Sequence, residues 1–191
     1  TDFQARNSAK GLVSDNRICY SVYMIHLVSG DILLTDAQAI AHGIAPNDPF
    51  DHGLALALRN RWPAMHKDYR HWAHTQQPKP GEVWAWGGFG IRIFNLLTQE
   101  GTFAHGERPG RATLQNLNHA LKKLHELVLE HNIKSLALPR LATGVGALEW
   151  KDVEPLIQRH FADLNIPIYV YATFHANQKA VEPGLPAQVI G

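Results

Sequence analysis

The segment that most restricts the fold of this chain is residues 136–157, LALPRLATGVGALEWKDVEPLI. It opens with a short apolar run that Pro139 ends, which is typical of a buried strand. After the glycines, Trp150, Val153 and Ile157 recur at intervals of three and four residues, the period of one helix face. The order is therefore strand, glycine loop, helix.

The glycine loop, residues 142–147, carries Gly144 and Gly146 between that strand and that helix. Glycine lets the backbone turn with a positive φ, and it lets another group come within contact distance of the main chain. A helix N-terminus adds unpaired amides and a partial positive charge, so this arrangement is suited to hold a phosphate. A tight turn that binds nothing has the same pattern, because a lone Gly-x-Gly is a weak motif.

Strands and helices alternate along the chain. Apolar runs predict strands at 25–28, 39–42, 82–86, 91–97, 135–138 and 167–173, and helical periodicity predicts helices at 53–62, 64–75, 113–131 and 151–164. The alternation predicts an α/β layer fold with helices on both faces of a mixed sheet. Such sheets bind ligands beyond the carboxyl ends of their strands, so a site is expected in the loops that follow the strands.

Bulk composition excludes several classes of protein. Lys and Arg total 18 and Asp and Glu total 17, a net charge of +1, which provides no footprint for a long polyanion such as duplex DNA. The single cysteine, Cys19, excludes an internal disulfide framework. No uninterrupted apolar run reaches the ~18 residues of a membrane span. We expect a soluble, monomeric protein of the cytoplasm.

The two ends of the chain differ from its middle. Residues 1–23 show neither the alternation of a strand nor the periodicity of a helix, and they are predicted to be an N-terminal extension. A predicted strand follows directly after Met24. Residues 177–191 are rich in Pro and Gly and are predicted to be a C-terminal tail. One domain is therefore expected at residues 24–176.

Several motifs of this domain resemble those of macrodomains. Residues 28–32, VSGDI, are similar to their first strand and Gly-Asp-Ile turn, and residues 138–150, LPRLATGVGALEW, are similar to their second glycine loop. That loop is most similar to the branch with terminal ADP-ribose protein glycohydrolase and the antitoxins that remove ADP-ribose from DNA. The middle of the chain, from Ala41-His42-Gly43 to Lys67-Asp68-Tyr69, and residues 104–108 resemble a fungal phosphatase of ADP-ribose 1″-phosphate.

The resemblance implies a three-layer α/β/α macrodomain with a mixed, mostly parallel sheet that binds ADP-ribose. It implies that the second glycine loop wraps the diphosphate, that Asp31 accepts a hydrogen bond from the adenine amino group, that Phe174 stacks on adenine, and that Asn47 lies near the distal ribose. The implied ligand contacts are Asp31, Ile32, Asn47, Gly53, Thr98, Ala142, Thr143, Gly144, Val145, Gly146, Ala147, Leu148 and Phe174. Without the resemblance, Asp31 would be an ordinary turn or cap residue and Phe174 a core residue.

The departures from the resembled pattern concern catalysis. The ADP-ribose glycohydrolases of this branch use a lysine after the strand that corresponds to 91–97, where this chain has TQEG at 98–101, and the aspartate of some second loops is Gly146 here. The first loop of the resembled pattern usually carries small residues. Here it is residues 50–53, FDHG, and has Asp51 and His52 in their place. The predicted catalytic set is Asp51, His52, His105 and Glu107. Histidine can move a proton near pH 7, and a carboxylate can orient the imidazole or a water.

Two classes of function stay open. The first is a hydrolase that acts at the 1″ position of ADP-ribose and removes ADP-ribose from protein or nucleic acid, or removes a phosphate. The second is a non-catalytic reader that binds free or attached ADP-ribose. The expected partner is ADP-ribose or an ADP-ribosylated macromolecule, with nucleic acid only as such a substrate.

No cofactor, metal or membrane partner is expected. His71 and His74 share one helix face, but no Cys or carboxylate joins them at the spacing of a zinc site.

Overall fold

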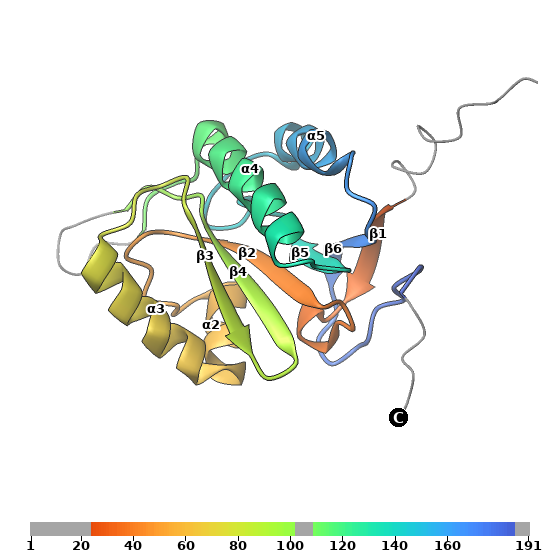
Figure 1. Ribbon diagram of the computed structural model, residues 1–191, viewed down its shortest axis with the longest axis horizontal. Helices are drawn as coiled ribbons and strands as arrows, with labels where there is room; N and C mark the ends of the chain where they lie inside the picture. The colour runs from red at the N-terminus through yellow and green to blue at the C-terminus, as the bar shows by residue number, and fades with distance from the viewer. Residues whose placement is uncertain (1–23, 102–108, 186–191) are drawn as a thin grey trace, which may run out of the picture.

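The computed structural model describes residues 24–101 and 109–185. Within these residues one sheet has the order β1-β6-β5-β2-β4-β3, in which β3 alone runs antiparallel to its neighbour. The strands are β1 (Ile25–Gly30), β2 (Ala39–Ile44), β3 (Val83–Gly88), β4 (Ile91–Leu97), β5 (Leu136–Pro139) and β6 (Ile168–Phe174). The helices are the short 3-10 helix η1 (Ile32–Leu34), α2 (Gly53–Arg61), α3 (Pro63–Gln76), α4 (Leu114–Glu130) and α5 (Trp150–Phe161). In Figure 1, α4 and α5 lie on one face of the sheet and α2 and α3 on the other, so the predicted three-layer α/β fold is confirmed.

Each face of the sheet has its own apolar core. The predicted stripe of α4 is buried, with Leu117 and Leu121 fully covered against one face, and Tyr69 of α3 is buried against the other. Successive strand residues go to opposite cores, as Ala39 and Ile40 do in β2, because side chains alternate along a strand. Burial on both faces accounts for the continuous apolar runs of these strands.

The predicted strands and helices are all present. The largest difference in a boundary is at α5, which ends at Phe161 rather than Leu164. The start of α4 is fixed by Thr113, whose Oγ1 accepts a hydrogen bond from the amide of Asn116 at 3.0 Å. No helix in the described part of the chain is long and apolar enough to cross a membrane.

Residues 177–185 are bound to the domain. The amide of Asp31 donates to the carbonyl of Gln178 at 2.7 Å, and the Tyr171 hydroxyl donates to the carboxylate of Glu182 at 3.0 Å. The expected domain boundary at residue 176 stays a prediction, and these bonds attach the first part of the expected tail to the edge of the sheet near β1.

Candidate functional site

The carboxyl ends of the five parallel strands meet at one edge of the sheet, and the predicted ligand contacts follow them. Asp31 follows β1 and Phe174 ends β6, which pairs with β1 in register at Gly30 and Phe174. The second glycine loop follows β5, and Asn47 follows β2. The sheet order β1-β6-β5-β2 therefore sets these groups out in a row, in the order adenine, diphosphate and distal ribose that the resemblance implied.

Short backbone hydrogen bonds fix the second glycine loop. Leu148 donates its amide to the carbonyl of Ala142 at 2.9 Å, and Ala147 donates to Gly144 at 3.0 Å. Ala112 donates to the carbonyl of Gly146 at 3.0 Å, which attaches the loop to the segment before α4. The loop is thus a closed, hydrogen-bonded turn.

The glycines of this loop are needed for close contact and not for a positive φ. Glycine would have allowed a positive φ here, but in this loop the positive φ values occur at Ala142 (φ 61°) and Ala147 (φ 60°). A Cβ at position 146 would lie 2.6 Å from the carbonyl oxygen of Ala142, whereas a Cβ at position 144 would meet nothing within 4 Å. Gly146 is therefore required by the turn itself, and Gly144 leaves open space outside it.

Three consecutive amides of the loop have no partner in the described part of the protein, and two of them belong to exposed residues. Within the described residues, the N–H groups of Gly144, Val145 and Gly146 make no hydrogen bond to the protein, while those of Thr143, Ala147 and Leu148 donate to loop carbonyls. Gly144 and Val145 are exposed whereas Gly146 is buried, so the amides of Gly144 and Val145 are the two that an anion can reach. α5 begins shortly afterwards at Trp150, so its N-terminal partial charge faces the same region. Unpaired amides beside a helix N-terminus form a phosphate cradle.

Asp31 caps η1 and also binds the segment that follows β6. Its Oδ1 accepts from the amide of Leu33 at 3.0 Å and its Oδ2 from the amide of Asn177 at 3.0 Å, so the cap reading is correct. Each carboxylate oxygen has a second lone pair, so the predicted bond to adenine stays open. Ile32 is buried, and the ring of Phe174 is 70% exposed, unlike a core residue.

The first loop presents an Asp–His pair at the surface. Asp51 and His52 are joined by a hydrogen bond of 2.5 Å between Oδ1 and Nδ1, and their side chains are 54% and 63% exposed. The bond engages Nδ1 of His52, holds the imidazole ring in one orientation and leaves Nε2 as the second ring nitrogen. Gly53 follows with φ 54° and open space around it, and it begins α2.

The rest of this loop is held rigidly beneath that pair. Asp48 accepts hydrogen bonds from the amides of Ala45 at 3.1 Å and Phe50 at 2.8 Å, and burial raises the pKa of its carboxyl group. Phe50 is fully buried with φ 55°, and its ring contacts Tyr69 at 5.2 Å between centroids. The Tyr69 hydroxyl donates to the carbonyl of Pro46 at 2.8 Å. The hydrogen bonds to Asp48 and the contacts with Tyr69 therefore fix the conformation of the loop after β2.

His42 and Thr98 lie below the surface of the site. Nε2 of His42 is hydrogen bonded to the amide oxygen of Asn95 at 2.6 Å, and burial lowers the pKa of His42 to about 4, so it is neutral at pH 7. Thr98 is fully buried, its hydroxyl has no partner among the described residues, and it lies 2.8 Å from the position of a Cβ on Gly43. The predicted contact of Thr98 with the ligand stays a prediction.

Three further residues were predicted at the distal ribose or in the catalytic set. Asn47 is exposed after β2, as expected for a contact at the distal ribose. His105 and Glu107 lie outside the described residues. Among the described residues, no group of three or more His, Cys, Asp or Glu side chains could hold a metal ion.

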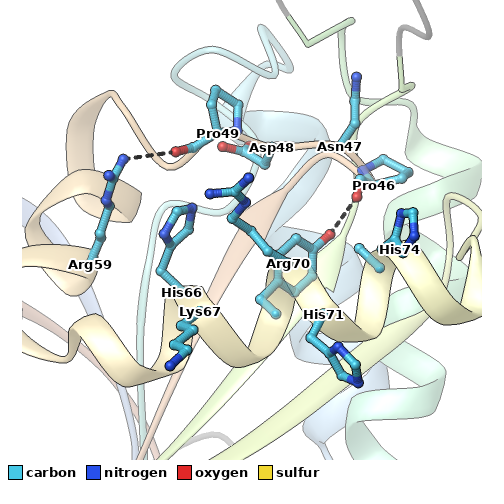
Figure 2. A pocket seen from close by; sticks show the side chains of 12 residues that line it. Pro46, Asn47, Asp48, Pro49, Arg59, His66, Lys67, Arg70, His71 and His74 are labelled. Atoms are coloured by element: carbon cyan, nitrogen blue, oxygen red, sulfur yellow. Dashed lines mark hydrogen bonds between the residues drawn. The ribbon is translucent and has the colours of Figure 1, made fainter.

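A groove of about 890 Å³ runs beside this end of the sheet, between the loop after β2 and the helices α2 and α3 (Figure 2). Its lining residues are Pro46, Asn47, Asp48, Pro49, Arg59, His66, Lys67, Tyr69, Arg70, His71, Ala73 and His74. Sequence reasoning assigned nothing to Arg59, Lys67 or Arg70. The sequence does contain a signal for this basic face, because Lys67, Arg70 and His74 recur at the spacing of one helix face.

The Macro domain family model matches residues 43–157 of the chain. The ADP-ribose glycohydrolase OARD1 of Homo sapiens is 26% identical over 148 residues, which cover 77% of this chain and 90% of that protein. The DNA ADP-ribosyl glycohydrolase of Mycobacterium tuberculosis is 29% identical over 150 residues, which cover 74% of this chain but only 40% of that protein.

Solved structures with the same fold include two macrodomains of DarG. The one from Thermus aquaticus has a TM-score of 0.69 at 24% identity and covers 78% of this chain and 98% of its own. The one from Mycobacterium tuberculosis has a TM-score of 0.68 at 25% identity and covers 78% of this chain and 97% of its own.

Proposed function

Because the chain belongs to the Macro domain family, we propose that it binds ADP-ribose across the carboxyl edge of its sheet and hydrolyses the bond at the 1″ position. The observation that carries this proposal is the pair of free, exposed amides at Gly144 and Val145, at the middle of the row of candidate contacts. Two relatives, which are named ADP-ribose glycohydrolase and DNA ADP-ribosyl glycohydrolase, support it.

In this proposal the ligand lies along the row of strand ends. The adenine amino group donates to Asp31 while the exposed ring of Phe174 stacks on the base. The diphosphate accepts hydrogen bonds from the two exposed amides of the second glycine loop, those of Gly144 and Val145, and this neutral cradle needs no lysine. The distal ribose then reaches Asn47 and the first loop.

The Asp51–His52 pair supplies the proposed chemistry. His52 accepts a proton from a water that attacks C1″, and Asp51 holds the imidazole and stabilises its protonated form. The bond from C1″ to the leaving group breaks with its electron pair on the leaving group, which takes a proton from solvent. Residues 98–101 contain no lysine, and the proposed mechanism accordingly uses no covalent adduct between ADP-ribose and a lysine.

A reader without turnover is the second candidate. The exposure of Asp51 and His52 favours it, because catalytic groups work best where water is excluded. The two candidates separate in paired experiments: a calorimetric titration with ADP-ribose, and turnover of ADP-ribosylated protein, ADP-ribosylated DNA and ADP-ribose 1″-phosphate. Release in any turnover assay supports the hydrolase, and binding without release in all three supports the reader.

The monomeric state and cytoplasmic location belong to the proposal as well. Size-exclusion chromatography with light scattering tests the first, and a mass of two chains would contradict it.

A further inference from the structure

Residues 177–183, here called the covering segment, pack against the end of the sheet at which the adenine base is proposed to bind. The segment follows β6 and lies against Gly30, the last residue of β1. A Cβ on Gly30 would stand 2.8 Å from the carbonyl oxygen of Gln178 and 2.9 Å from the Cβ of Ala180. The covering segment is therefore in close contact with the chain directly before Asp31.

The covering segment supplies part of what holds the carboxylate of Asp31. The amide of Asn177 donates to Oδ2 of Asp31 at 3.0 Å, and the amide of Asp31 donates to the carbonyl of Gln178 at 2.7 Å. The other carboxylate oxygen, Oδ1, accepts from the amide of Leu33 at 3.0 Å. Because main-chain amides of two different segments hold the two oxygens, the carboxylate has one orientation, and its remaining lone pairs are left for a ligand.

Glu182 attaches the other end of the covering segment to η1, the turn that Asp31 begins. Its Oε2 accepts hydrogen bonds from the hydroxyl of Thr35 at 2.5 Å and from that of Tyr171 at 3.0 Å. Its Oε1 accepts from the amide of Asp36 at 2.8 Å. Hydrogen bonds to an ionised carboxylate are roughly twice as strong as neutral ones. Since Thr35 is the C-cap of η1, the covering segment is bonded at both ends of η1.

This attachment is polar, and Glu182 is its main anchor. Within the covering segment, Ala180 alone is buried, while Glu182 is half-buried. Lys179 forms an ion pair with Asp36 at 2.7 Å, but both side chains are exposed, so the pair contributes little. Removing the carboxylate of Glu182 should therefore release the covering segment without opening the core of the sheet.

We propose that Glu182 is a positioning residue for base recognition: by holding the covering segment, it orients the carboxylate of Asp31 toward the adenine amino group. This inference rests on the proposed function, in which Asp31 accepts that hydrogen bond. Glu182 acts through Asn177 and Gln178 and does not itself contact the ligand. A hydrogen bond weakens steeply as its alignment is lost, so a carboxylate that is free to turn recognises the base less well.

The test is a double-mutant cycle on Asp31 and Glu182 in the full chain, with calorimetric titrations of ADP-ribose and of ribose 5-phosphate, which lacks adenine. The proteins are the parent, Asp31→Ala, Glu182→Ala and the double variant. The matched control is Glu126→Ala on α4, which removes an exposed carboxylate that pairs with Lys123. Urea unfolding of each protein checks that it is folded under the conditions of the titration.

Glu182→Ala should weaken the binding of ADP-ribose by roughly three- to tenfold, less than the loss of a whole hydrogen bond to a carboxylate, because Asp31 is still present but no longer held. The affinity for ribose 5-phosphate should stay close to that of the parent, and the control should match the parent with both ligands. The double variant should bind ADP-ribose no more weakly than Asp31→Ala, since the orientation of a carboxylate that is absent cannot matter.

Losses that multiply in the double variant would overturn the inference, as would equal losses for the two ligands, because either result makes Glu182 a general support of the fold. If Glu182→Ala does not fold, Glu182→Gln takes its place in the cycle, since it keeps the size of the side chain and one acceptor oxygen. The same coupling is expected with a smaller loss, and the same two outcomes would overturn it.

The failure of the proposed function has a separate signature. A parent that gives no heat with ADP-ribose contradicts the proposed function and the inference with it. Equal affinity of the parent and Asp31→Ala for ADP-ribose contradicts the assignment of adenine to Asp31 and overturns the inference, but leaves the phosphate cradle in place. A loss in Asp31→Ala with parental affinity in Glu182→Ala contradicts the role of Glu182 alone.

Discussion

Gly146 and the carbonyl group of Ala142 lie so close that no side chain fits between them. A Cβ on residue 146 would stand 2.6 Å from that carbonyl oxygen and 2.9 Å from the Cβ of Ala112. This contact closes the second glycine loop and holds it against the segment before α4, which Ala112 joins through its hydrogen bond to Gly146. The free amides of the loop are therefore presented by a backbone with little room to move.

Gly146→Ala should destabilise the protein by about 1–3 kcal/mol, because the new methyl group must push backbone apart. Gly144→Ala is the matched control, since its Cβ would meet nothing within 4 Å and should leave stability within about 0.5 kcal/mol of the parent. Urea unfolding measures both. Equal free energies of unfolding for the two variants would show that the close contact does not constrain the loop.

Asp31→Ala should weaken the binding of ADP-ribose about ten- to a hundredfold, the worth of one hydrogen bond to a carboxylate. Ribose 5-phosphate, which lacks adenine, should lose far less. The variant should also unfold more easily, because the amides of Leu33 and Asn177 lose their acceptor. Titration with both ligands separates these effects, and equal losses for the two would mean that Asp31 only holds the loop.

His52→Ala should lower the rate of hydrolysis by roughly 10²–10⁴, the usual contribution of general acid–base catalysis, with binding little changed. The matched control is His125→Ala, since His125 pairs with Asp163 at 2.9 Å on the other layer of the fold. Single-turnover rates on the best substrate measure both. Parental turnover in a folded Asp51→Ala, His52→Ala double variant would move the search to His105 and Glu107.

His42 should make the protein sensitive to acid. Burial lowers its pKa from 6.5 to about 4, so protons bind the unfolded state more tightly than the folded one. The free energy of unfolding from this residue is fully present above pH 6.5 and should fall by roughly 3 kcal/mol as the pH drops to about 4. Other groups titrate in the same window, so the measurement is the difference between the parent and His42→Gln. Parallel curves for the two proteins would contradict the assignment.

Much of the fold could be predicted because its signals are local. The periodic leucines of α4 and the apolar runs of the strands are visible in the sequence, and each strand buried on both faces keeps its run unbroken. The antiparallel direction of β3 was not predicted, since pairing depends on contacts between distant segments. The end of α5 was placed three residues late because the apolar period continues through Leu164, which is buried after the helix has ended.

The candidate site was predictable in part for the same reason. The glycine loop has a local pattern, but the left-handed residues Ala142 and Ala147 carry no mark in the sequence, because alanine adopts that backbone only when the surrounding bonds impose it. The net charge of +1 did not indicate the groove between the loop after β2 and the helices α2 and α3, although the helical spacing of Lys67 and Arg70 marked one of its walls. Its cations come from two helices, and only folding brings Arg59 next to Arg70.

The binding of ADP-ribose at the second glycine loop is tested most directly by calorimetric titration of the parent, Gly144→Ala and Gly144→Glu. Position 144 has open space around it, so both variants should fold like the parent, which unfolding curves check. The parent should bind ADP-ribose and Gly144→Ala should retain measurable binding, while the carboxylate of Gly144→Glu beside the free amides should remove measurable heat by repelling the diphosphate. A folded Gly144→Glu that binds ADP-ribose with the heat of the parent would contradict this account.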